Sequence, residues 1–113
     1  LVKEINEDLI IDLFGLDLTL TSAYMKKSIL FVGNDSGLMH LSVASKLRVI
    51  SLFGPTNDRV YGPYGKKNII LRTKENLDYF KSINIDENKS YMNSISLNFV
   101  LQNCEKLLNE NFN

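Results

Sequence analysis

The sequence predicts an α/β fold in which a parallel sheet is flanked by helices. Two short apolar runs, Ile29 to Val32 and Val49 to Phe53, have the composition of strands that are buried on both faces. Between them, apolar residues from Leu38 to Lys46 recur at steps of three and four, which is the period of a helix. Such a connection is right-handed, so the two strands should be parallel neighbours in one sheet.

Weaker signals precede this strand–helix–strand unit. Residues Leu9 to Leu13 are mostly apolar and predict a third strand. Gly15 then supplies a turn. Either Thr19 or Thr21 is the expected cap of a helix that runs to Lys27.

The second half of the chain alternates between loop-like and regular segments. Asn57 to Lys67 has the Gly, Pro and Asn content of a loop, and Asn68 to Leu71 predicts a short strand. Thr73 to Ser90 is polar and without a clear period, which predicts a surface segment. Ser96 is the expected N-cap of a last helix. The apolar face of this helix is marked by Leu97, Val100, Leu101, Cys104, Leu107 and Leu108.

The composition is that of one ordinary globular domain. Of the 113 residues, 44% are hydrophobic, and 13 basic side chains balance 13 acidic ones. This balance gives no reason to expect general binding of nucleic acid. The single cysteine, Cys104, excludes an internal disulfide framework, and no apolar run reaches the ~20 residues of a membrane span. Because the first residue is not Met, we expect the chain to be a fragment or a processed piece.

The two polar turns of the central unit should lie at the same edge of the sheet. Asn34 to Gly37 follows the first strand, and Gly54 to Asn57 follows the second. Open parallel sheets bind ligands at the carboxyl ends of their strands. The helix that begins near Gly37 would point its unpaired N–H groups and its positive dipole end into this crevice, which suits a phosphate or pyrophosphate. The pattern therefore predicts an anionic ligand such as a nucleotide.

The same residues resemble a known family. Asp35 to His40 (DSGLMH), followed by Leu52 to Thr56 (LFGPT) and a trailing Pro63-x-Gly65, resembles the donor-site signature of glycosyltransferase family 9, which includes the ADP-heptose:lipopolysaccharide heptosyltransferases. Met92 to Val100 is similar to the way chains of that family end, so the resemblance spans most of the sequence.

The resemblance implies a fold, a donor and an acceptor. Members of the family are GT-B glycosyltransferases with two Rossmann-like domains facing a cleft, and the C-terminal domain holds most of the nucleotide sugar. By this resemblance, residues 1–113 form one donor-binding C-terminal domain that is incomplete at its N-terminus. The implied reaction transfers a sugar from ADP-heptose or a similar donor to the lipopolysaccharide core, with inversion. No cofactor, metal, nucleic acid or membrane span is expected.

The resemblance also implies which parts are missing. The family's general base and acceptor site lie in the N-terminal domain, and a Thr- and Lys-containing phosphate loop comes earlier in the C-terminal one. Neither is present in these residues, so we expect no catalytic residue here and no activity from this stretch alone. The implied location is cytoplasmic, with a peripheral position at the inner face of the inner membrane as a further expectation.

Each residue of the signature has an implied role and a simpler structural alternative. Asp35 is expected to hold sugar hydroxyls of the donor, or only to cap the helix. Ser36 and Gly37 are expected to offer backbone N–H groups to the diphosphate. His40, in the first helical turn, is expected to donate a hydrogen bond as a neutral imidazole. Further donor contacts, or only a turn that ends the strand, are expected at Gly54, Pro55 and Thr56.

Two other functions stay open at this point. The chain could be a non-catalytic nucleotide-binding module that gates a partner. It could also belong to a nucleotide-sugar epimerase, whose donor site likewise uses a Ser/Asp-Gly turn at a helix start. Upstream sequence with a first Rossmann domain and an acidic general base would favour the transferase over the binding module.

Overall fold

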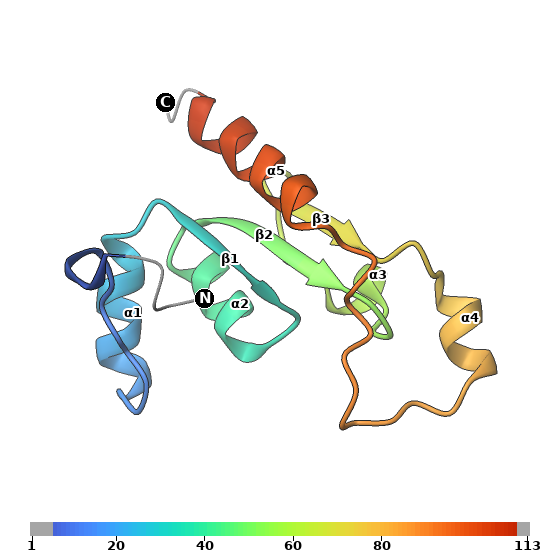
Figure 1. Ribbon diagram of the computed structural model, residues 1–113. Helices are drawn as coiled ribbons and strands as arrows, with labels where there is room; N and C mark the ends of the chain where they lie inside the picture. The colour runs from blue at the N-terminus through green and yellow to red at the C-terminus, as the bar shows by residue number, and fades with distance from the viewer. Residues whose placement is uncertain (1–5, 111–113) are drawn as a thin grey trace.

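The computed structural model describes residues 6–110 and is built around a three-stranded parallel sheet (Figure 1). Its strands are β1 (Leu30–Asn34), β2 (Arg48–Phe53) and β3 (Ile69–Arg72), in the order β1-β2-β3. Leu30 lies opposite Arg48, and Asn34 lies opposite Leu52. The predicted parallel pairing of the two central strands is therefore confirmed, as is the predicted short strand that follows them.

Helices cover both faces of this sheet. On one side lie α1 (Leu18–Lys26) and α2 (Gly37–Ala44), and on the other lies α5 (Leu97–Asn109) (Figure 1). Three shorter helical segments complete the described chain: the 3-10 turn η2 (Glu7–Leu9), α3 (Asp58–Tyr61) and α4 (Leu77–Ser82). The predicted α/β class, with a parallel sheet and flanking helices, is confirmed.

The core consists of two apolar clusters separated by the sheet. Successive residues of a strand point to opposite faces, and β2 supplies both clusters in this way. Val49 and Phe53 pack with Met39 of α2 on one face. Ile50 packs with Leu71 and Leu107 on the other. This arrangement explains why β2 reads as a continuous apolar run.

The predicted strand at Leu9 to Leu13 is wrong. Leu9 lies at the end of η2, and the residues after it form no strand. The side chain of Asp12 accepts a hydrogen bond from the N–H of Phe14 at 2.9 Å, which closes a turn instead. Leu9 is 77% exposed. Among the described residues, no strand of the sheet pairs with this apolar segment. The predicted turn at Gly15 is present, with a φ of 79°.

The helix after this turn is present, but neither Thr19 nor Thr21 caps it. The N-cap of α1 is Asp17, whose carboxylate accepts a hydrogen bond from the N–H of Leu20 at 2.8 Å. Thr21 instead donates its hydroxyl to the carbonyl of Asp17 at 2.8 Å. Asp17, the residue directly before α1, therefore caps this helix in place of either threonine.

The segment from Thr73 to Ser90 is more structured than its composition predicts. It contains α4, and Phe80 of this helix is buried. The ring of Phe80 makes edge contacts with Tyr79 and Tyr91, with centroids 5.3 and 6.0 Å away. One buried aromatic ring anchors a short helix without producing any repeat, which is why no period is visible in the sequence.

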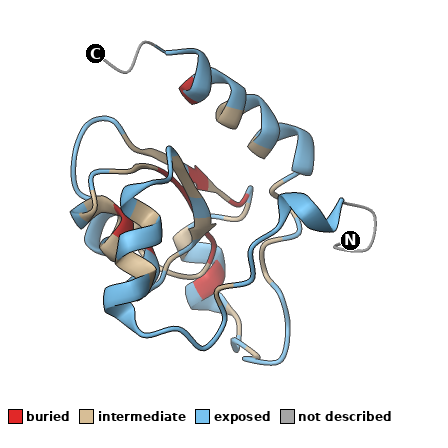
Figure 2. Ribbon diagram, turned by 90° about the vertical axis from the view of Figure 1, so that its left-hand side faces the viewer, coloured by how far each residue is buried: buried red, intermediate tan, exposed pale blue. Residues whose placement is uncertain are grey.

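The last helix begins where expected but buries less than expected. Ser96 is the N-cap of α5, and its hydroxyl accepts a hydrogen bond from the N–H of Phe99 at 3.1 Å. Figure 2 shows α5 exposed over most of its length, with its buried and half-buried positions on the side toward the sheet. Leu107 is buried and Val100 and Cys104 pack against the same cluster, whereas exposure is substantial at Leu97, Leu101 and Leu108. None of the helices within residues 6–110 is long and apolar enough to span a bilayer.

Candidate functional site

The start of α2 forms a polar corner at the carboxyl edge of the sheet. The helix begins at Gly37, and Ser36 is its N-cap, with the N–H of Met39 donating to the Ser36 hydroxyl at 3.4 Å. The capping alternative for Asp35 is therefore wrong. Ser36, Gly37 and His40 are all exposed. A Cβ added at Gly37 would meet no atom within 4 Å, so the approach to the backbone here is open.

Asp35 is half-buried directly before this helix. Its carboxylate makes no hydrogen bond or ion pair with any residue that the structure describes. A carboxylate that has no protein partner is free to accept hydrogen bonds from a ligand. This geometry is compatible with a contact to sugar hydroxyls.

The second loop lies beside the first. Because Asn34 and Leu52 are opposite each other in the sheet, the chain leaves β1 and β2 at neighbouring points of one edge. Met39, in the first turn of α2, packs against Phe53, the last residue of β2. Gly54 follows and is buried, while Pro55 and Thr56 are half-buried. The topology thus brings together the two loops that the sequence predicts as neighbours.

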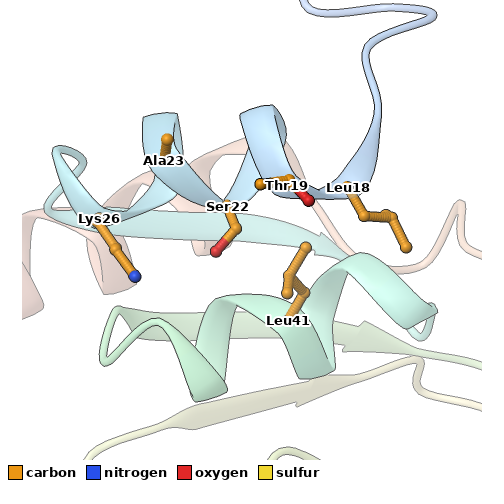
Figure 3. Close-up of a pocket in the computed structure, with 6 residues that line it drawn as sticks. All are labelled: Leu18, Thr19, Ser22, Ala23, Lys26 and Leu41. Atoms are coloured by element: carbon orange, nitrogen blue, oxygen red, sulfur yellow. The ribbon is translucent and has the colours of Figure 1, made fainter.

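Three of the predicted residues line one groove along α2. It has a volume of about 560 Å³, and its lining as a whole is almost entirely apolar. The residues that line it are Leu18, Ser36, Gly37, Leu38, His40, Leu41 and Ala44. A neighbouring groove of about 490 Å³ lies between α1 and α2, with Leu18 and Leu41 in both linings (Figure 3). Asp35 and the Gly54 to Thr56 loop lie outside the lining of both grooves.

Arg72 holds the loop after β2 in place at the carboxyl edge of the sheet, and no sequence pattern predicts this role. Arg72, at the end of β3, donates hydrogen bonds to the carbonyls of Gly54 and Thr56 and to the carboxylate of Asp58. It also lines a polar groove of about 400 Å³ with Asp58 and Arg59. No local motif marks Arg72, since it simply follows a short apolar strand. Within residues 6–110, no group of three or more His, Cys, Asp or Glu side chains could hold a metal ion.

The fold and the carboxyl edge of the sheet are those of a ligand-binding α/β protein. A parallel sheet with two polar loops at its carboxyl edge, one of which opens a helix, is the arrangement with which α/β proteins bind ligands.

The sequence model of glycosyltransferase family 9 (heptosyltransferase) matches residues 2–90. The chain belongs to this family. The match ends before Met92 to Val100, so the resemblance of that segment to family chain ends stays a prediction.

Two of the individual relatives are named as heptosyltransferases. The lipopolysaccharide heptosyltransferase 3 of Escherichia coli (strain K12) is 36% identical over 89 residues, which cover 78% of this chain and 26% of the relative. The lipooligosaccharide heptosyltransferase 2 of Campylobacter jejuni subsp. jejuni serotype O:2 is 44% identical over 42 residues, covering 37% of this chain and 13% of the relative. The chain therefore spans about a quarter or less of these relatives. No solved structure gave a significant match.

Proposed function

We propose that this chain is the nucleotide-sugar-binding part of the C-terminal domain of a heptosyltransferase-like glycosyltransferase. The observation that carries the proposal is the corner formed by Ser36, Gly37 and His40, three exposed residues that share one groove at the start of α2. The family match covers all three residues. The proposed donor is ADP-heptose or a similar nucleotide sugar, and the proposed acceptor is the lipopolysaccharide core. For an enzyme with these substrates we propose a cytoplasmic location, and as a further proposal a peripheral position at the inner face of the inner membrane.

In this proposal the start of α2 receives the diphosphate of the donor. An acceptor oxygen attacks the anomeric carbon, a base elsewhere in the protein takes the acceptor proton, and the bond from the anomeric carbon to the diphosphate breaks. The departing oxygen keeps the electron pair, so negative charge grows on the diphosphate. The N–H groups at Ser36 and Gly37, the dipole of α2 and a hydrogen bond from His40 stabilise that charge.

Asp35 has a different role in the proposal. A carboxylate beside a diphosphate is repelled by it, so Asp35 would raise the barrier if it faced the phosphates. Asp35 is half-buried, and its carboxylate, which has no partner among the described residues, suits the hydroxyl groups of the donor sugar. The Gly54 to Thr56 loop lies outside the groove along α2 but leaves the sheet at the neighbouring point of the same edge, and we propose that it forms the second wall of the site. The match to a glycosyltransferase family disfavours the alternative of a nucleotide-sugar epimerase. The other alternative, a non-catalytic nucleotide-binding module, would use the same site for its nucleotide.

The substitution His40→Ala tests the proposal. If His40 donates a hydrogen bond to a charged diphosphate, its loss should weaken nucleotide binding by about 1.5 to 3 kcal/mol, or roughly ten- to a hundredfold. The measurement is calorimetric titration of ADP and of an ADP-sugar into a purified protein that also contains the upstream phosphate loop implied by the family resemblance. The fold is checked by circular dichroism, since an exposed helical position should tolerate alanine.

The matched control is Glu105→Ala, an exposed helical position in α5 on the other face of the sheet. It should leave both affinities unchanged. Equal affinities for the wild type and His40→Ala, with the fold intact, would mean that His40 is only a surface residue of α2.

A further inference from the structure

The guanidinium of Arg72 joins three points of the loop that leaves β2. Its Nη2 donates to the carbonyl of Gly54 at 2.6 Å, and its Nη1 donates to the carbonyl of Thr56 at 2.9 Å. The same Nη1 donates to the Asp58 carboxylate at 2.7 Å. Both charged side chains are about four-fifths shielded from water, with exposed fractions of 22% for Arg72 and 20% for Asp58. One side chain from β3 thus binds the loop at alternate residues.

Asn57 and Asp58 are held by the first turn of α3, where the carbonyl of Asn57 accepts hydrogen bonds from the N–H groups of Val60 and Tyr61. Residues 54–56 contribute little to their own conformation. Pro55 lacks a backbone N–H and cannot donate. Outside helices and strands, no backbone–backbone hydrogen bond in the described structure involves residues 54–56. Gly54 is also closely packed, since a Cβ added there would lie 2.8 Å from the Sδ of Met92. A methionine side chain is adaptable, so it fills space without fixing backbone direction.

We infer that Arg72 is a positioning residue for nucleotide-sugar binding, because it fixes the Gly54 to Asp58 loop beside the start of α2. The inference rests on the proposed function, which makes this loop the second wall of the donor site. The link to the first wall is the contact between Phe53, immediately before the loop, and Met39 in the first turn of α2. Arg72 binds the loop through its carbonyls, which leaves the Thr56 hydroxyl and the remaining face of the loop for the ligand.

The chemistry of this contact requires arginine. A planar guanidinium presents several N–H groups in one fixed fork and can serve three acceptors at once, whereas a lysine ammonium is a compact point charge. Arg72→Lys therefore keeps the charge and loses most of the clamp. If the unclamped loop adopts its binding conformation about a tenth of the time, the apparent affinity falls about tenfold.

The experiment compares Arg72→Lys with Arg48→Lys. Arg48 is a matched control because it also donates to a carbonyl, that of Leu107 at 2.9 Å, and to a carboxylate, that of Glu110 at 3.1 Å. It begins β2 and so lies at the opposite edge of the sheet. Calorimetry with ADP gives the affinity, and ¹⁵N heteronuclear relaxation at the amides of Thr56 and Asn57 gives the order of the loop.

We expect Arg72→Lys to increase the mobility of the amides of Thr56 and Asn57 and to weaken ADP binding about tenfold. Arg48→Lys should change neither the mobility of these amides nor the affinity for ADP. An affinity for ADP that is equal in the two variants overturns the inference, whatever the relaxation data show. If the wild type itself fails to bind ADP and the ADP-sugar, the proposed function falls, and this inference with it. If the wild type binds but Arg72→Lys binds equally well, only the inference falls.

Asp58→Asn keeps the test decisive if Arg72→Lys does not fold. This substitution removes the charge partner of the clamp and leaves the guanidinium with its two carbonyl acceptors. It should loosen the same amides and weaken ADP binding, though less than Arg72→Lys does. An unchanged loop and an unchanged affinity would overturn the inference.

Discussion

Ser94 links two segments that are distant in the sequence and lowers the pKa of a nearby carboxylate. Its hydroxyl donates to Glu75 at 2.7 Å and accepts a hydrogen bond from the N–H of Lys74 at 2.9 Å. The hydrogen bond from Ser94 is the main reason why the pKa of Glu75 lies below its ordinary value of 4.5. A depressed carboxylate pKa stabilises the fold above the unfolded-state pKa, and this stabilisation is lost as the pH falls through the folded-state value.

We predict that Ser94→Ala raises the pKa of Glu75 toward its ordinary value. The reason is that the ionised form loses the donor that favours it. An NMR titration that follows the side-chain carboxyl carbon of Glu75 measures the change. Ser28→Ala, which removes a hydroxyl bonded only to the carbonyl of Tyr24, is the control and should not move the titration. Identical titrations of Glu75 in the wild type and Ser94→Ala would contradict the assignment.

Residue-level contacts also explain how far the site could be predicted. The positions of Ser36, Gly37 and His40 follow from a strand, a turn and a helix that are consecutive in the chain, so local pattern was sufficient. Arg72 could not be found in this way, because its partners Gly54 and Asp58 lie 18 and 14 residues away. Their meeting depends on the register between β2 and β3, which no short motif encodes.

At the scale of elements, only one of the two strands predicted to be buried on both faces, β2, is so buried, because Ile29 and Val32 of the other run are 62% and 42% exposed. The run from Val49 to Phe53 is buried on both faces of the sheet and had one consistent interpretation. The run from Leu9 to Leu13 has similar composition but lies at the surface without a strand partner, since apolar content alone does not supply a neighbour. α4 went unpredicted because its single buried side chain, Phe80, leaves no repeat.

Two adjacent leucines test how α5 is held. Leu107 is 3% exposed and packs against Ile50 and Leu71, whereas Leu108 is 41% exposed. Leu107→Ala should lower the free energy of unfolding by about 2 to 5 kcal/mol, because it leaves a cavity against the sheet. Leu108→Ala, the matched control, should change it by about 0.5 kcal/mol or less. Urea denaturation followed by far-UV circular dichroism gives both values, and equal losses would mean that α5 does not pack through Leu107.

At the scale of the whole molecule, the proposed reaction needs more than the residues described here. The chain spans 26% of its E. coli relative, and the proposal assigns the base and the acceptor site to other parts of the protein. Orientation of two reactants in one cleft can account for about 7 to 11 kcal/mol of a barrier. In the proposed two-domain arrangement, one half of the cleft cannot align both reactants.

We therefore predict that the 113-residue polypeptide alone transfers no sugar from a nucleotide donor. A transfer assay with ADP-heptose and a lipopolysaccharide-core acceptor measures this, with a full-length heptosyltransferase as the positive control. Transfer by the 113 residues at a rate comparable to that control would show that the catalytic groups lie within them.

The order of strands in the sheet has a consequence for folding. β1, β2 and β3 are neighbours in space in the same order as in the chain, so each pairing closes only a short loop. The docking of α5 is different, since the bond from Arg48 to the carbonyl of Leu107 joins residues 59 positions apart. Early contacts in folding are those of low sequence separation. The corner between β1 and α2 should therefore form while the chain is still being synthesised, before α5 closes the far face of the sheet.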